Sequence, residues 1–263
     1  MNETDPRKVL REARQLVKSE QYAAALEKYT WFHNHALDFD GALAGVRLSY
    51  AILEWVDLGE VYPPAREALE RVRDAKTESL TQGTYDVRLF HDVASINRAF
   101  GHVERTRDLF KTIADADRSV AEKFFRIALE SLVDTKEFSL ARSFMPDPQK
   151  QIEQFAMPFK FGRQSTPSVS SEFQEAQEVF VRIYIKNVSR ILQVFLGVGE
   201  ENVANHLRHY ALECVADAQL RDGLWSGYIL RRLLHKFNSG STDEIRRSHQ
   251  LAPFVRQNPG RWV

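Results

Sequence analysis

Two histidines and a glutamate are spaced as the metal ligands of a single helix would be. His206, His209 and Glu213 fall at i, i+3 and i+7, so a helix would place all three side chains on one face. Imidazole and carboxylate groups are common zinc ligands. The sequence lacks the His-Glu-x-x-His arrangement that combines ligands with a general base. We therefore expect no cofactor, and a metal-dependent enzyme using this face ranks below the other function classes.

The remaining groups with catalytic potential have simpler structural interpretations. Cys214 lies in an apolar stretch, where a free thiol packs as a small hydrophobic side chain. The pairs Asp38/Asp40 and Asp115/Asp117 fall between expected helices, where aspartate caps helix starts. No catalytic residues are assigned from these groups, and we expect the protein not to be an enzyme.

Composition indicates a protein that folds in water. The 263 residues are 43% hydrophobic and 27% charged, with a formal net charge of zero. No apolar run is long enough to span a bilayer, so we expect no membrane insertion. The N-terminus leads into a charged amphipathic helix in place of the apolar core of a secretory signal, which predicts a cytoplasmic location.

Apolar residues recur at three- and four-residue spacing up to residue 143, which is the period of an α-helix. Helices are expected at residues 6–18, 21–37, 41–57, 63–75, 84–100, 103–114, 120–133 and 138–144. Their short connections require neighbouring helices to be antiparallel. The predicted fold class is therefore all-α, built from αα-hairpins.

The second helix of each pair opens with a large apolar residue followed three positions later by a small one. These pairs are Tyr22/Ala25, Tyr62/Ala65, Val103/Thr106 and Phe138/Ala141. The small residues are 40, 41 and 35 positions apart, a period typical of a helical solenoid. Large residues follow four positions later, at Tyr29, Leu69, Phe110 and Met145. Twelve positions before the small residue come Ala13, Leu53, Ala94 and Leu129. These columns predict close helix packing within and between hairpins.

Two segments carry a family resemblance. Gln21-Tyr-Ala-Ala-Ala-Leu-Glu-Lys-Tyr29 and Leu58-Gly-Glu-Val-Tyr-Pro-Pro-Ala-Arg-Glu-Ala-Leu69 resemble the middle of tetratricopeptide repeats. The resemblance covers residues 6–145 and implies a right-handed superhelix with a concave groove that binds a protein or peptide. HEAT and armadillo repeats are the alternative helical-repeat families.

The repeat pattern stops near residue 145. Several prolines and a Ser-rich stretch predict an irregular linker or loop over residues 146–170. Helices are expected again at 171–196, 200–220 and 224–237, and this segment, 171–238, would pack on or cap the solenoid. Homo-oligomerisation through these helices is the rival. Residues 239–263 are expected to form a partly ordered tail.

A basic column accompanies the repeats. Eighteen positions before each small residue lie Arg7, Arg47, Arg88 and Lys123, and His91 and Arg98 share the helical face of Arg88. In tetratricopeptide repeats this helix position faces the groove, so the resemblance implies a cationic ladder there. The alternative is that Glu54 and Glu130 neutralise the groove by pairing with arginines of adjacent repeats.

The leading hypothesis is a scaffold or adaptor that holds an acidic peptide or partner helix in this groove, because guanidinium groups bind carboxylates. The second is nucleic-acid or anionic-surface binding by the basic C-terminal segment. That segment includes Arg231, Arg232, Lys236, Arg246 and Arg247. Nucleic acid is the less favoured partner, because the chain is neutral overall and carries no recognised reading motif.

Overall fold

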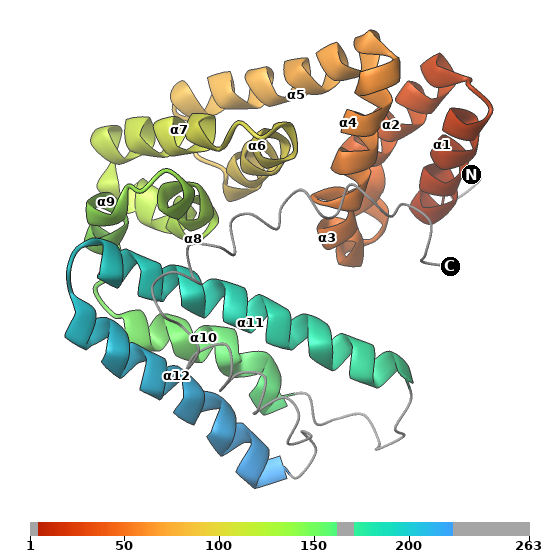
Figure 1. The fold of residues 1–263 in the computed structure, drawn as a ribbon. Helices are drawn as coiled ribbons and strands as arrows, with labels where there is room; N and C mark the ends of the chain where they lie inside the picture. The colour runs from red at the N-terminus through yellow and green to blue at the C-terminus, as the bar shows by residue number, and fades with distance from the viewer. Residues whose placement is uncertain (1–4, 162–170, 223–263) are drawn as a thin grey trace. The chain divides into compact units, whose positions relative to one another are not determined.

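A computed structural model describes residues 5–161 and 171–222 (Figure 1). Every regular element in these residues is a helix, which confirms the all-α prediction. The chain divides into two compact units, Met1–Thr135 and Lys136–Val263. None of the described helices is both long enough and apolar enough to cross a bilayer.

The first unit begins with capped helices. Asp5, Asp86 and Asp117 each accept a hydrogen bond from a backbone N–H in the first turn of the helix that follows. The elements of this unit are α1 (Pro6–Lys18), α2 (Tyr22–Phe39), the 3₁₀ turn η1 (Gly41–Leu43), α3 (Ala44–Arg47), α4 (Tyr50–Val61), α5 (Pro63–Thr81), α6 (Val87–Phe100), α7 (Val103–Ala116) and α8 (Arg118–Asp134).

Helices adjacent in the chain pack against each other, as hairpins do: α1 with α2, α4 with α5, and α6 with α7. Contacts also join helices two elements apart. The first helices of successive pairs form a row, in which α4 contacts α6 and α6 contacts α8. A second row joins α5 to α7 (Figure 1). These packed helix pairs are compatible with a helical repeat.

The columns of small and large residues lie in the cores of the two units. The four small residues are fully buried, with no exposed area: Ala25, Ala65, Thr106 and Ala141. The large residues four positions later are buried as well: Tyr29, Leu69, Phe110 and Met145. This burial follows from their spacing, because residues four apart lie on the same face of a helix.

One predicted helix, 41–57, is wrong in part. The structure breaks it into η1, α3 and α4, with the interruption at Leu48 and Ser49. The break changes which face of α4 is buried, so Ile52 and Trp55 enter the core while Leu53 is 46% exposed. The column that placed Leu53 in the core therefore fails in this hairpin. Arg47, the last residue of α3 before this break, turns its side chain inward to bond Asp92.

The second unit contains α9 (Phe138–Ser143), α10 (Pro148–Phe161), α11 (Ser171–Gly197) and α12 (Glu201–Asp222). Within it α9 packs on α11, and α10, α11 and α12 pack on one another. The tyrosine hydroxyl of Tyr184 on α11 donates to the carbonyl of Ala211 on α12 at 2.7 Å. The expected helix at 224–237 and the tail at 239–263 lie outside the described residues.

The prediction of an irregular linker at 146–170 is wrong for α10. Pro148 stands at the start of that helix, where a missing N–H costs nothing. Asp147 precedes it and accepts a hydrogen bond from the Lys150 N–H at 2.9 Å. The expected domain boundary near 145 also moves, because α9 belongs to the second unit. The chain turns at Lys136, which has a positive φ of 62°.

Gly59 lies where α4 and α5 approach each other closely. A Cβ at this position would lie 2.9 Å from the Cβ of Arg66 and 3.2 Å from its backbone. Because those atoms cannot move without α5, Gly59→Ala is expected to destabilise the protein by about 1–3 kcal/mol. Gly45→Ala is the matched control, since its Cβ would meet nothing within 4 Å and alanine favours the helix by up to about 1 kcal/mol. Equal urea midpoints for the two variants would contradict the prediction.

Candidate functional site

Basic side chains gather on adjoining faces of α6 and α8. Arg88, His91 and Arg98 share one face of α6 at i, i+3 and i+10, and Lys123 and Arg126 share one face of α8 at i, i+3. We call these five residues the basic face.

Glu130 lies one turn beyond Arg126 on α8. It forms an ion pair with Arg98 at 3.2 Å, which joins α8 to α6. Arg88 and Lys123 are exposed. Neither makes a side-chain ion pair within the described residues.

The electrostatics of His91 indicate how closely these cations gather. Burial lowers the pKa of His91, and the charges of Arg98, Arg47 and Arg126 act in the same direction. Asp92 opposes them without reversing the shift. The charged form of the half-buried His91 is therefore disfavoured both by burial and by guanidinium groups on three helices. A surface of this kind favours anionic groups.

Next to His91 lies an ionic cluster of four side chains from four helices, three of them buried and the fourth, Lys76, partly exposed. They are His33 on α2, Arg47 on α3, Lys76 on α5 and Asp92 on α6. Arg47 donates to both carboxylate oxygens of Asp92, from Nη1 at 2.6 Å and Nη2 at 2.8 Å. Lys76 donates to the same carboxylate. Arg47 also donates through Nε to the carbonyl of His33 at 2.5 Å.

Burial alone would raise the pKa of Asp92, but the hydrogen bond from Arg47 and the charges of Lys76 and Arg47 outweigh it and hold that pKa below its ordinary value. Burial lowers the pKa of Lys76, and Asp92 offsets part of that shift. One carboxylate thus faces two cations in a site that holds four helices together.

His33 completes the cluster as a neutral ring. Its Nε2 lies 3.1 Å from Lys76 Nζ and 3.3 Å from Arg47 Nη2, both of which can only donate. Burial, followed by the charges of Arg47 and Lys76, lowers the pKa of His33 to about 3. Its Nε2 therefore accepts, and its Nδ1 is buried without a partner in the described structure.

The structure brings some of the predicted groove residues together and separates others. Arg88, His91, Arg98 and Lys123 belong to the basic face. Arg47 is buried in the ionic cluster, although its charge reaches His91.

Arg7 lies elsewhere in the unit and pairs with Asp40 at 2.7 Å. That Asp40 side chain also caps η1 through the Ala42 N–H, as its position between helices predicted.

The pairing of arginines with Glu54 and Glu130 also occurs. Arg14 on α1 donates to both oxygens of Glu54 on α4, at 3.0 and 3.1 Å. Arg98 pairs with Glu130 as described above. The acidic residues of these faces are therefore neutralised by arginines of neighbouring helix pairs, as the alternative in the sequence predicted.

The histidines of α12 do not assemble a ligand set. His206 is 3.1 Å from the side-chain nitrogen of Gln149, and His209 Nδ1 is 2.8 Å from the carbonyl of Asn205, one turn earlier. Neither contact involves Glu213. Across residues 5–161 and 171–222, no three His, Cys, Asp or Glu side chains lie where they could hold a metal. The basic residues from Arg231 to Arg247 lie outside the described part of the chain.

Sequence reasoning missed Lys76 and Asp92. The signal for Asp92 was a lone carboxylate within the otherwise buried run of α6, because a buried acid must be paired. Nothing in the spacing of Lys76 points to that partner.

No family model, curated protein or solved structure matches this sequence.

Proposed function

We propose that the chain is a non-enzymatic interaction scaffold that binds an acidic peptide or partner helix across the basic face. The observation that carries this proposal is the gathering of Arg88, Arg98, Lys123 and Arg126 on adjoining faces of α6 and α8, which the Arg98–Glu130 ion pair joins. Arginine binds carboxylates with paired, charge-assisted hydrogen bonds, so a segment rich in Asp or Glu fits this surface.

We further propose that residues 6–145 are divergent tetratricopeptide-like repeats arranged as a right-handed superhelix. The support is the buried small residue of each second helix and the row formed by α4, α6 and α8. In such an arrangement the first helices, which carry the basic face, would line the concave side. The repeat framework would then position Arg88 and Lys123, both exposed, for a partner.

Charge reversal tests the proposal in two steps. Partners captured by the native chain from its own cells are first identified by mass spectrometry, and an acidic segment of one partner is then synthesised. The double variant Arg88→Glu/Lys123→Glu is expected to weaken binding of that peptide at least about tenfold, roughly 1.4 kcal/mol. Binding should also weaken as salt is raised, because the attraction is between exposed charges.

The matched control reverses two exposed cations on the other row of helices. Arg71 on α5 and Lys111 on α7 are exposed, so Arg71→Glu/Lys111→Glu changes the net charge equally without touching the basic face. Equal losses in the two double variants would indicate a general charge effect and contradict the proposed site. An unchanged affinity in the first variant would do the same.

A further inference from the structure

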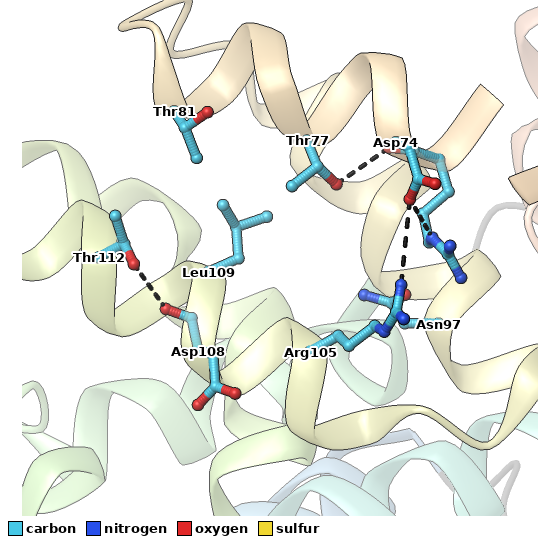
Figure 2. Close-up of a pocket in the computed structure, with 9 residues that line it drawn as sticks. Asp74, Thr77, Thr81, Asn97, Arg105, Asp108, Leu109 and Thr112 are labelled. Atoms are coloured by element: carbon cyan, nitrogen blue, oxygen red, sulfur yellow. Dashed lines mark hydrogen bonds and ion pairs between the residues drawn. The ribbon is translucent and has the colours of Figure 1, made fainter. Parts of the chain in front are cut away.

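The two units differ in the kind of surface that they leave open. In the first unit, Figure 2 shows a polar pocket lined by α5, α6 and α7. Thr77 and Thr112 there donate to backbone carbonyls one turn earlier in their own helices, and Arg105 pairs with Asp74 at 4.0 Å. The second unit instead exposes apolar side chains, which is the stronger indication that another element covers them.

The long helix α11 has one face that is covered near its C-terminal end. There Gly197 lies against the ring of Phe138, where α9 packs on α11. Val179 is eighteen positions before Gly197, which is five full helical turns, so both residues lie on this face. Because α9 has 6 residues and α11 has 27, α9 covers only part of the face.

The part of this face around Val179 is apolar and exposed. Val179, Phe180 and Ile183 are neighbours on the helix, with exposed fractions of 47%, 42% and 49%. We call these three residues the α11 patch. The buried residues Tyr184 and Val188 lie on the other side of the helix. The α11 patch therefore lacks the cover that the rest of this helix has.

The described part of the chain ends at Asp222, close to the α11 patch. Three residues connect α11 to α12, and Tyr184 donates to the carbonyl of Ala211, so the two helices form an antiparallel hairpin. Asp222 is eleven positions after Ala211, which places it about level with the residue eleven positions before Tyr184. The chain after Asp222 therefore begins near the start of α11, about 10 Å along the helix from Val179.

We propose that residues 224–237 of this same chain pack on the α11 patch as an amphipathic helix. In this segment Leu230, Leu233, Leu234 and Phe237 recur at i, i+3, i+4 and i+7, which is one face of a helix. Gly223 directly follows α12, at a position where glycine commonly ends a helix and lets the chain reverse. A helix over 224–237 would extend about 21 Å back along α11, which brings its leucines level with the patch.

The charges of the segment agree with this placement. Arg231, Arg232, His235 and Lys236 lie opposite the leucines on a helical projection. When the leucines contact the α11 patch, these four side chains remain in water, where a charge carries no desolvation cost.

Two other occupants fit the α11 patch less well. The segment 162–170, which precedes α11, has Val169 as its one aliphatic or aromatic residue. A second copy of the chain would need a larger surface, because a specific interface takes about 20–30 residues a side, and the α11 patch has three described side chains. A segment joined to Asp222 needs less area, since its effective concentration is already about millimolar.

Cysteine pairs in the full chain test the proposal. Cys214→Ala removes the single native cysteine, with circular dichroism to check the fold, and Ile183→Cys places a thiol in the α11 patch. A second cysteine then replaces, one at a time, the residues of two sets. These are Leu230, Leu233 and Leu234 on the apolar face of the segment and Arg231, Arg232 and His235 on its polar face.

A disulfide forms only where two Cβ atoms approach within about 3.5–4.5 Å. Under mild oxidation of dilute protein, we expect at least one apolar-face pair to close within a single chain about tenfold faster than every polar-face pair. A non-reducing gel measures the rates. Equal rates for the two sets would contradict the proposal. A disulfide between two chains that forms faster as the protein is concentrated would assign the patch to a second copy and overturn it.

A second measurement needs no cysteine. Leu233→Asp/Leu234→Asp is expected to uncover the α11 patch, so the fluorescence of the apolar dye ANS should rise at least about twofold. The matched control Arg232→Ser/Lys236→Ser changes the net charge equally on the polar face and should leave the fluorescence unchanged. Adding Ile183→Asp to the leucine variant should remove most of the rise. A rise that persists, or no rise at all, would show that the segment does not cover this patch.

Discussion

Replacing Asp92 with Asn is expected to destabilise the first unit by about 3–5 kcal/mol, the usual cost of removing one partner from a buried charge network. The asparagine keeps the shape of the side chain but removes the only carboxylate in the ionic cluster. The buried Arg47 and the partly exposed Lys76 would then face each other without a counter-charge. A loss of this size is a large fraction of the stability of a typical domain.

Urea unfolding followed by circular dichroism measures the effect. Asp38→Asn is the matched control, because Asp38 has a 68% exposed side chain and should change the midpoint little. The double variant Asp92→Asn/Lys76→Met should recover part of the loss, since it removes one of the uncompensated cations. A single variant within about 0.5 kcal/mol of the native chain would show that the cluster does not hold the helices together.

Much of the fold follows from local patterns in the sequence. The helix start at Asp117 was readable because capping involves residues two or three positions apart. The burial of Ala25 and Ala65 was readable because their spacing to large neighbours matches one helical face. These features depend on residues a few positions apart, so they could be predicted from the sequence alone.

The residue that ends α3 bonds a distant partner. Arg47 bonds Asp92, which lies 45 positions further along the chain, and no local sequence pattern predicts that pairing. At α10 the error was the opposite one: the prolines predicted a linker, but Pro148 begins a helix. The pairing of Arg47 is set by residues that meet across the fold, whereas α10 starts with a local pattern, a capping aspartate followed by proline, that the linker prediction overlooked.

The basic column shows the same limit within the candidate site. Arg47 and Arg88 hold equivalent positions eighteen residues before a small residue, yet Arg47 is buried and Arg88 is exposed. The spacing placed Arg88 near the start of α6, but it did not predict that Arg47 would end the short helix α3. It did not predict where each side chain points, because that depends on whether a buried acid lies within reach.

His33 should make the stability of the first unit depend on pH in a window set by its two pKa values. Its folded pKa is about 3, against an ordinary value of 6.5. Above pH 6.5 neither state binds the proton, so the full stability is present. As the pH falls below 6.5, His33 binds a proton in the unfolded chain but not in the folded chain, so stability is lost. The loss ends below about pH 3, where His33 is protonated in both states. Between pH 6.5 and 4.5 the expected loss is about 2 kcal/mol.

His33→Gln isolates this contribution, because glutamine does not titrate and its carbonyl oxygen can still accept from Lys76. The variant is expected to be less stable than the native chain at pH 7, since it disturbs the packing against Trp55, but its urea midpoint should change much less between pH 6.5 and 4.5. His35→Gln is the matched control. That imidazole lies two residues further along α2 with a 50% exposed side chain, so its removal should leave the native pH slope in place. If His33→Gln keeps the full pH slope, His33 does not resist protonation in the folded chain. The ring is then not the neutral acceptor that Arg47 and Lys76 require, and the prediction is contradicted.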